Sequence, residues 1–274
     1  MSLTRPRRRR RVGRALALAL VVVVLAAIGY AVWSAPQGGP GPAAQRSAGD
    51  GTQPSAGDGE CVPAAVDGIP RQPHGERPLP GPAQSRAALT ALLVAPRAGG
   101  ATFCRGRFGP DTWPDLDRNG CTTRQDVLVR QAVSVTTRRI AVHDGTCEEA
   151  VAGTWIDPYT GSTLTFSNLK DPGQAQRLQI DHVVSLYDAW VSGARDWTDE
   201  QRVIFANDLA APELRAVSGD TNFAKGRAGP ETWSPAPDRR CDVARAIVEV
   251  KSRYRLTVTA AERDALSAML TTCS

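Results

Sequence analysis

The stretch Gln179-Ile180-Asp181-His182-Val183-Val184, followed later by Asn222-Phe223-Ala224-Lys225, decides how the chain is organised. Its apolar residues predict a strand over residues 176–184, and residues 214–217 predict a second strand. Earlier in the chain, residues 133–141 and 163–166 predict two further strands. Successive side chains of a strand point to opposite faces, so Asp181 and His182 meet different surroundings. Asn222 and Lys225 are three residues apart at the start of a predicted helix and therefore share one helical face.

These side chains are suited to cutting a phosphodiester bond. That reaction needs a base to deprotonate water and a divalent cation to hold the phosphate. His182 is the candidate base, because an imidazole has an ordinary pKa of about 6.5. Asp181 and the amide oxygen of Asn222 are candidate ligands, since Mg²⁺ often takes only one or two protein oxygens. Lys225 is the candidate contact to a phosphate oxygen.

The chain resembles the secreted bacterial branch of the HNH endonuclease family, which includes GmrSD-like C-terminal domains. The resemblance runs from about residue 104 to the end of the chain. The segments that carry it are Asp117-Arg118-Asn119-Gly120-Cys121-Thr122-Thr123-Arg124, Asp157-Pro158-Tyr159-Thr160-Gly161, Ile180-Asp181-His182-Val183-Val184, Asp188-Ala189-Trp190, Phe205-Ala206-Asn207-Asp208, Pro212-Glu213-Leu214, Asn222 with Lys225-Gly226, and Val250-Lys251-Ser252-Arg253-Tyr254.

The resemblance implies an α+β fold built on a ββα-metal (HNH) finger. A pair of helices would be inserted between the strands of the finger, within a disulfide-stapled, mostly helical domain. It also implies that His182 is the general base, that Asp181 binds the metal, and that Asn222 occupies the last position of the HNH pattern. Glu213 and Asn207 would have orienting roles.

Two residues depart from the family pattern. Glu213 stands where many relatives have the middle Asn, and Arg227 stands where many have Asp after Lys-Gly. Glu213 would either orient the loop that carries the histidine, as Asn does, or add negative charge beside the metal. Because of these two departures, a domain that has lost catalytic activity is an alternative interpretation.

The N-terminus predicts export. Seven arginines lie within residues 1–14, and an uncharged apolar run covers residues 15–33. Nineteen apolar residues are enough to span a bilayer, which favours an uncleaved signal anchor; a cleaved signal peptide with a Gly29-Tyr30-Ala31 site is the alternative. In either case the arginines stay in the cytoplasm and the rest of the chain is secreted or anchored outside the plasma membrane.

Charge and composition divide the remaining chain. The N-terminal arginines exceed the net charge of +5, so the exported part is slightly acidic and any nucleic-acid-binding patch must be local. Residues 34–60 are rich in Gly, Pro, Ala and Ser and predict a flexible linker. Residues 61–274 form the predicted exported domain, which we expect to be monomeric.

All six cysteines lie beyond the apolar run, in an even number that predicts three disulfides in an exported protein. Six cysteines allow fifteen pairings. We favour Cys121 with Cys147, Cys241 with Cys273, and Cys61 with Cys104.

Residues 115–126 resemble a calcium-binding loop. Asp115, Asp117, Asn119 and Asp126 occupy positions 1, 3, 5 and 12 of the EF-hand pattern, and Gly120 occupies position 6. A structural Ca²⁺ is one interpretation, and a simple turn next to Cys121 is the other. His74 and His143 lie in a proline-rich stretch and a turn, so we expect surface positions for both rather than ligand roles.

Two functions from different classes follow. The first is an extracytoplasmic HNH endonuclease that hydrolyses DNA, with RNA as an alternative substrate, using Mg²⁺ or Mn²⁺. The second is a catalytically degenerate HNH fold that serves as a calcium-stabilised binding module of the cell envelope. Retention of Asp181, His182 and Asn222 favours the enzyme, whereas Glu213 and Arg227 favour the module.

Overall fold

A computed structural model describes residues 61–143 and 145–274. The predicted signal anchor and linker lie outside these residues. In the described part of the chain, no helix is both long and apolar enough to cross a bilayer. The helices and strands, in chain order, are α2 (Pro82–Ala91), η1 (Gly100–Thr102), η2 (Arg105–Phe108), α3 (Thr123–Gln131), β1 (Ala132–Val142), β2 (Gly145–Ile156), β3 (Thr163–Phe166), α4 (Pro172–Ala175), β4 (Leu178–His182), α5 (Leu186–Val191), η3 (Ala194–Asp196), α6 (Asp199–Ala206), β5 (Leu214–Ser218), α7 (Gly219–Lys225), η4 (Pro237–Arg239), α8 (Arg240–Arg253) and α9 (Ala260–Leu270).

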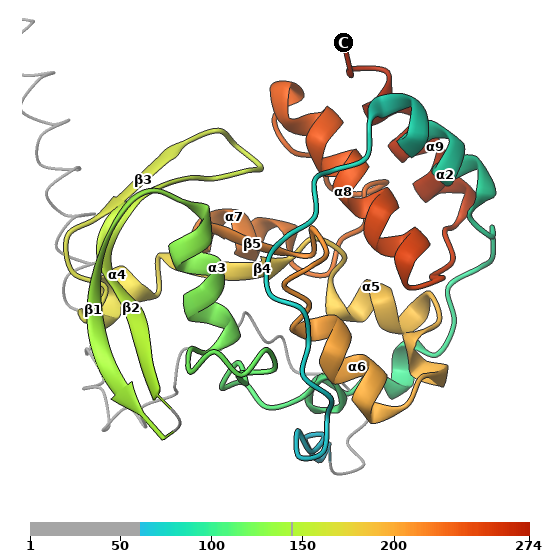
Figure 1. Cartoon of the computed structure of the whole chain (residues 1–274). Coiled ribbons are helices and arrows are strands. Elements are labelled where there is room, and N and C mark those ends of the chain that lie inside the picture. The colour runs from blue at the N-terminus through green and yellow to red at the C-terminus, as the bar shows by residue number, and fades with distance from the viewer. Residues whose placement is uncertain (1–60, 144) are drawn as a thin grey trace, which may run out of the picture. The chain divides into compact units, whose positions relative to one another are not determined.

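A two-stranded antiparallel sheet of β4 and β5 lies between the other layers (Figure 1). Its register pairs Leu178 with Ser218 and His182 with Leu214. Helices α5 and α6 lie between the two strands in the sequence, as predicted. Helix α7 follows β5 without a loop, because the Ser218 side chain caps it by accepting a hydrogen bond from Thr221 N at 3.0 Å.

The second sheet is antiparallel in the order β1-β2-β3 and packs with α3 against one face of the β4–β5 sheet. Trp155 of β2 is fully buried and donates a hydrogen bond from Nε1 to Leu128 O at 2.8 Å. Leu178 and Ile180 belong to the same core. Residues Gln179 and Asp181, which alternate with them, therefore face the opposite side of β4.

A helical layer of α2, α8 and α9 forms the other side of the fold (Figure 1). These helices share an apolar core with α5 and α6, built around residues such as Val250, Leu266 and Phe205. The fold is thus mixed α+β with small antiparallel sheets. Sequence patterns predicted much of β1 and all of β3, but not β2, so the domain contains more sheet than expected.

Three disulfides join Cys61 to Cys104, Cys121 to Cys147, and Cys241 to Cys273. These are the pairs that the sequence analysis favoured. The third disulfide links the first turn of α8 to the segment that follows α9. The two C-terminal helices are therefore held together covalently as well as by their apolar faces.

Candidate functional site

A cavity of about 400 Å³ lies where the end of β4 meets α5 and α7. Asp181 and His182 reach it from β4, and Asn222 reaches it from α7. The structure therefore gathers three of the predicted site residues around one space. The other residues that line the cavity are Phe103, Arg105, Gln179, Ser185, Leu186, Tyr187, Gly219, Phe223, Gly226 and Arg227.

His182 is 5% exposed, and its ring is held on two sides. Its Nε2 lies 2.9 Å from the carbonyl oxygen of Ala206, and its ring stacks on Trp113 with centroids 5.6 Å apart. Because a carbonyl oxygen can only accept, the Ala206 contact places the imidazole proton on Nε2. In the neutral ring, Nδ1 then carries the lone pair that a general base requires.

Asp181 is bound by two groups from different elements. The Tyr159 hydroxyl donates to Asp181 Oδ2 at 2.6 Å, and Lys225 Nζ lies 2.9 Å from the same oxygen. Lys225 Nζ also donates to His182 O at 2.8 Å. Burial and the neighbouring Asp181 raise the pKa of Tyr159 well above its ordinary value, so the phenol stays protonated as a donor. A phosphate contact by Lys225 stays a prediction, and it would require this ammonium group to leave Asp181.

The Asn222 amide is oriented by a short chain of hydrogen bonds. Gln179 Nε2 donates to Gln176 O at 3.0 Å, so its Oε1 is the atom that accepts from Asn222 Nδ2 at 2.7 Å. Since Nδ2 points to Gln179, the Asn222 amide oxygen is the atom suited to a cation. The orientation of Asn222 thus depends on β4, the strand that also carries Asp181.

Glu213 lies behind the site and is fully buried. Its Oε2 accepts a hydrogen bond from Val184 N at 3.2 Å, in the loop after His182, and its main-chain oxygen accepts from Val183 N at 2.7 Å. Burial raises the pKa of Glu213 well above its ordinary value. These contacts agree with an orienting role for Glu213, but none of them tests catalysis.

Asn207, the other residue with a predicted orienting role, is 4% exposed and follows α6 directly. Its Nδ2 donates to Val203 O at 3.0 Å. Asn207 and His182 both line a small cavity of about 20 Å³ next to Trp113. Asn207 therefore lies near the histidine, while its Nδ2 is directed to α6.

The wall of the large cavity contains Arg105 and aromatic residues that the sequence analysis did not assign to the site, next to Arg227. The Arg227 guanidinium lies 5.1 Å from the ring centroids of both Phe103 and Tyr187. Phe223 on α7 is 77% exposed. Phe223 could have been found from the sequence, because it is an apolar residue in a predicted polar helix. The contact between Phe103 and Arg227 could not, because it joins segments far apart in the sequence.

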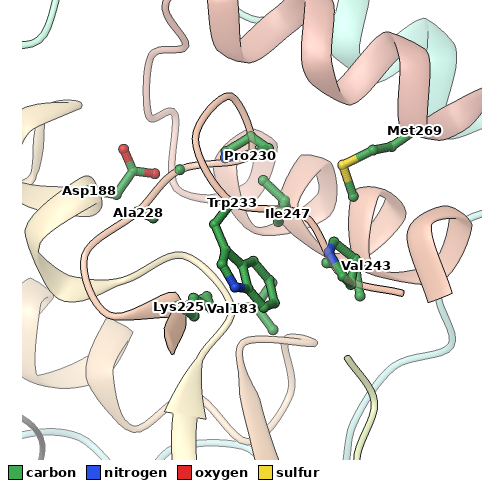
Figure 2. Close-up of a pocket in the computed structure, with 11 residues that line it drawn as sticks. Val183, Asp188, Lys225, Ala228, Pro230, Trp233, Val243, Ile247 and Met269 are labelled. Atoms are coloured by element: carbon green, nitrogen blue, oxygen red, sulfur yellow. The ribbon is translucent and has the colours of Figure 1, made fainter. Parts of the chain in front are cut away.

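Lys225 also borders a separate, much smaller cavity of about 10 Å³ (Figure 2). Its walls are mainly apolar side chains, including Trp233, Ile247 and Met269. A space of this size holds at most about one water molecule. This small cavity therefore has no room for a substrate.

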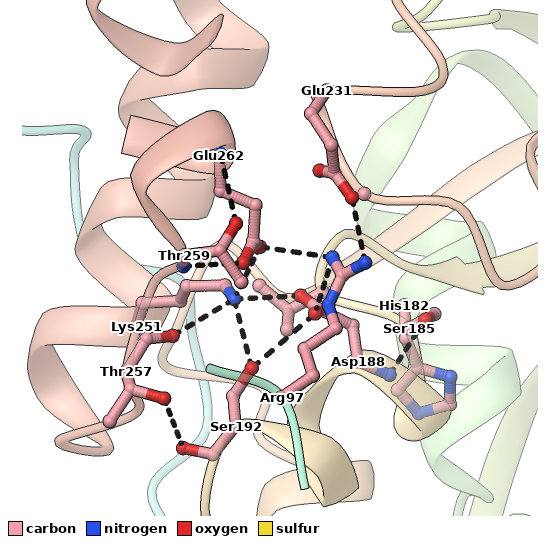
Figure 3. A network of polar contacts seen from close by, with 12 residues as sticks. Arg97, His182, Ser185, Asp188, Ser192, Glu231, Lys251, Thr257, Thr259 and Glu262 are labelled. Carbon is pink, nitrogen blue, oxygen red and sulfur yellow. Dashed lines mark hydrogen bonds and ion pairs between the residues drawn. The ribbon is translucent and has the colours of Figure 1, made fainter. Parts of the chain in front are cut away.

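A buried charge network fixes α5, the helix that follows the His182 loop (Figure 3). Lys251 Nζ lies 2.8 Å from both Asp188 Oδ2 and Glu262 Oε1, and the three side chains are almost completely buried. Burial alone would lower the pKa of Lys251, but the two carboxylates outweigh it and raise that pKa. Arg97 connects Asp188 to Glu231 at the edge of the network.

The predicted calcium loop has a different arrangement from the EF-hand pattern. Both carboxylate oxygens of Asp115 accept main-chain N–H groups, from Asn119 at 3.1 Å and from Gly120 at 2.8 Å, as in a simple turn. Asp117 and Asp126 instead come together with His74, with ligand atoms within 4.8 Å of one another. His74, expected to be a surface residue without a ligand role, thus joins the group although its side chain is 53% exposed.

The acidic cluster is electrostatically unfavourable by itself. Burial raises the pKa of Asp126 to about 6. Burial and the nearby Asp117 carboxyl raise the pKa of Asp115 as well. The loop thus brings carboxylates together in a partly buried place at a free-energy cost.

Comparisons with known proteins identify the family. A family model described as GmrSD restriction endonucleases, C-terminal domain, matches residues 134–269. A protein of Arthroderma benhamiae, named uncharacterized secreted protein, is 39% identical over 196 residues, which cover 71% of this chain and 87% of that protein. No solved structure matches the chain significantly. The secreted relative and the three disulfides together suggest an extracellular protein. The chain belongs to the family of GmrSD restriction endonuclease C-terminal domains.

Proposed function

We propose that the chain is a metal-dependent endonuclease that cuts DNA outside the cytoplasm, with its active site in the 400 Å³ cavity. Family membership suggests nuclease activity. The observation that carries the proposal is the placement of His182, Asp181 and Asn222 around one cavity, with the tautomer of His182 set by Ala206 O. In this interpretation β4, β5 and α7 are the HNH ββα-metal finger, within an exported domain of residues 61–274.

His182 acts as the general base. With its proton on Nε2 and directed to Ala206 O, the ring accepts a proton from water at Nδ1. The imidazolium that forms is stabilised by the same carbonyl, because Nε2 continues to donate to it. Trp113 limits rotation of the ring by stacking on it with an interplanar angle of 13°.

Asp181 and Asn222 would hold the cation. A carboxylate and an amide oxygen are hard ligands of the kind that Mg²⁺ and Mn²⁺ accept, and both side chains line the same cavity. An ionised carboxylate has about four acceptor positions, so contacts with Tyr159 and Lys225 do not by themselves prevent coordination. When bound, the cation would polarise the phosphate and stabilise the leaving oxygen.

Tyr159 and Lys225 act on Asp181. They fix the direction of its carboxylate before any cation arrives, which lowers the cost of organising the site. They also favour the ionised form of the carboxylate, because one donates a hydrogen bond and the other carries positive charge. Both residues therefore have positioning roles in the proposed reaction.

The wall formed by Phe103, Tyr187, Phe223, Arg105 and Arg227 fits a nucleic-acid substrate. Arginine side chains attract phosphates, and an exposed aromatic ring provides a surface for base stacking. The net charge of the chain gives no reason to expect DNA binding, because the N-terminal arginines account for it. The expectation of nucleic-acid binding therefore depends on these local side chains. RNA remains the alternative substrate, since both features suit either polymer.

A degenerate, calcium-stabilised envelope module is the second candidate function. The ion pair between Lys225 and Asp181 favours it, because the lysine already neutralises the proposed metal ligand. Arg227 favours it too, since its guanidinium rests on Phe103 and Tyr187 and replaces the acidic residue of many relatives. The two candidates differ in one measurable property, hydrolysis of a phosphodiester bond.

The test uses the full chain, purified with its disulfides intact, on supercoiled plasmid with Mg²⁺ or Mn²⁺. We expect nicking that EDTA abolishes and that falls by about 10²–10⁴-fold in a His182→Ala variant. His143→Ala is the matched control, because His143 is exposed in the β1–β2 turn. Absence of cutting of plasmid, single-stranded DNA and RNA by the folded wild type would favour the module instead.

A further inference from the structure

His74, Asp117 and Asp126 meet at a point where three parts of the chain converge. His74 belongs to the segment before α2, Asp117 to the loop before α3, and Asp126 to the first turn of α3. None of the three lines the 400 Å³ cavity, so the cluster is separate from the proposed active site. The sequence separation between His74 and Asp117 is 43 residues.

Two carboxylate oxygens in this cluster are buried and have no hydrogen-bond partner in the described part of the chain. They are Asp117 Oδ1 and Asp126 Oδ2. Asp117 is 1% exposed and Asp126 is 8% exposed, so water cannot solvate them as it does a surface carboxylate. Buried, unsatisfied carboxylate oxygens cost free energy unless a cation or donor approaches them.

Neighbouring cationic side chains do not supply this compensation through any hydrogen bond seen among the described residues. Arg71 Nε donates to the main-chain oxygen of Asp117 at 2.6 Å, and Arg118 Nη2 donates to Ile69 O at 3.1 Å. The other oxygens of the cluster have partners: His74 Nδ1 contacts Asp117 Oδ2, and Asn119 Nδ2 donates to Asp126 Oδ1 at 2.8 Å. The two unsatisfied oxygens are therefore suited to contact a cation.

We propose that His74, Asp117 and Asp126 bind one divalent transition-metal ion, Zn²⁺ or Mn²⁺, in a structural site distinct from the catalytic one. A mixed set of imidazole and carboxylate ligands suits these ions, whereas Ca²⁺ prefers oxygen ligands alone. The ligand atoms lie within 4.8 Å of one another. Two atoms that each lie about 2.1 Å from one ion are at most about 4.2 Å apart, so only a small contraction is needed.

The ion would attach the segment around His74 to α3. That segment also contacts the loop through the hydrogen bond from Gln72 N to Leu116 O at 2.8 Å and through packing of Ile69 with Leu116. Its link to α3 itself is an ion pair between Glu76 and Arg130 at 3.5 Å, which the metal would reinforce. Two of the three ligands precede α3, and the third lies on it. Metal binding would thus stabilise the segment against local opening.

The experiment compares the chelator-treated full chain with His74→Ala and Asp126→Asn variants, titrated calorimetrically with ZnCl₂, MnCl₂ or CaCl₂. We expect each variant to bind one Zn²⁺ or Mn²⁺ fewer than the wild type, or to bind it at least about 100-fold more weakly. The His143→Ala control should bind as the wild type does. Because Asp126→Asn keeps the size of the side chain, it remains informative if His74→Ala misfolds.

Trypsin sensitivity provides a second readout that is independent of nuclease activity. Saturating Zn²⁺ should slow cleavage of the Arg71–Gln72 bond in the wild type and have no effect in Asp126→Asn. Unchanged stoichiometry and affinity in both variants would overturn the proposal. So would Ca²⁺ binding that exceeds Zn²⁺ and Mn²⁺ binding and does not depend on His74.

Discussion

The indole of Trp113 lies parallel to the imidazole of His182, with an interplanar angle of 13° and 5.6 Å between ring centroids. Trp113 comes from the loop after η2, where its φ of 55° is unusual for a residue with a large side chain. A strained backbone conformation costs free energy and persists where the surrounding structure holds it, which favours a functional role for the stacking of Trp113 on His182. It makes Trp113 a positioning residue for the proposed base.

Replacing Trp113 by Leu should lower kcat on the order of 10²-fold, because a displaced base loses its alignment with water. Trp113→Phe should recover a large part of that activity, since a phenyl ring can still stack on His182. Plasmid nicking kinetics measure both variants. If Trp113→Leu and Trp113→Phe reduce kcat equally while both variants stay folded, aromatic stacking on His182 does not contribute to kcat.

The exposed ring of Phe223 should contribute to nucleic-acid affinity. Phe223→Ala should weaken binding of a DNA fragment by about 1–3 kcal/mol, the range for stacking of one base. Thermal stability should change little, because the side chain is 77% exposed. Leu93→Ala is the matched control, as Leu93 is 70% exposed and does not line the cavity. Equal dissociation constants for the two variants would contradict the assignment.

Removing the cation at the centre of the buried network should destabilise the fold strongly. Lys251→Met leaves Asp188 and Glu262 buried beside each other, and we expect a loss of about 3–5 kcal/mol in the free energy of unfolding. Urea denaturation measures the change. Lys170→Met is the comparison, because Lys170 pairs with Glu149 while 46% exposed, and its loss should cost about 0–1 kcal/mol. Similar losses in both variants would argue against the importance of burial.

Glu213 should make stability depend on pH. Its pKa in the folded protein is raised above the ordinary value of 4.5, so its contribution is fully present below that value and is lost as pH rises toward the folded-state pKa. Glu213→Gln mimics the protonated acid and removes this dependence. As pH rises from the ordinary pKa of 4.5 toward the raised folded-state pKa, the variant should gain stability relative to the wild type, by up to about 1.4 kcal/mol per pH unit. Urea unfolding curves with parallel pH dependence would show that Glu213 does not titrate in this range.

Local sequence patterns were sufficient to predict the sheet that carries the site. Residues 176–184 and 214–217 were expected as strands and contain β4 and most of β5, because apolar residues bounded by turn residues indicate strands. Strand β2 was missed, since Glu148 and Glu149 interrupt it and its buried residues do not alternate regularly. Glu148 and Glu149 form ion pairs with Arg139 and Arg138 of the neighbouring strand β1. The sequence of β2 alone does not indicate these pairs.

The contacts that organise the site depend on tertiary structure. Tyr159 and Asp181 are 22 residues apart, and the partner of His182 Nε2 is a main-chain oxygen that has no sequence signature. His74 contacts Asp117, which is 43 residues away in the sequence. The proline-rich surroundings of His74 predicted only a surface position, and nothing in the local sequence indicated this contact. Side-chain identity thus predicted which residues gather at the cavity, while their mutual hydrogen bonds required the folded chain.

The three disulfides join the cysteines in their order along the chain: the first with the second, the third with the fourth, and the fifth with the sixth. During export, therefore, each bond could close as soon as its second cysteine leaves the translocation channel, before a later cysteine competes for it. The order of emergence and the native pairing coincide, so oxidation during translocation needs no later reshuffling by an isomerase. All of the candidate catalytic residues lie between the second and third disulfides, and they fold onto a scaffold whose first two covalent links are already made.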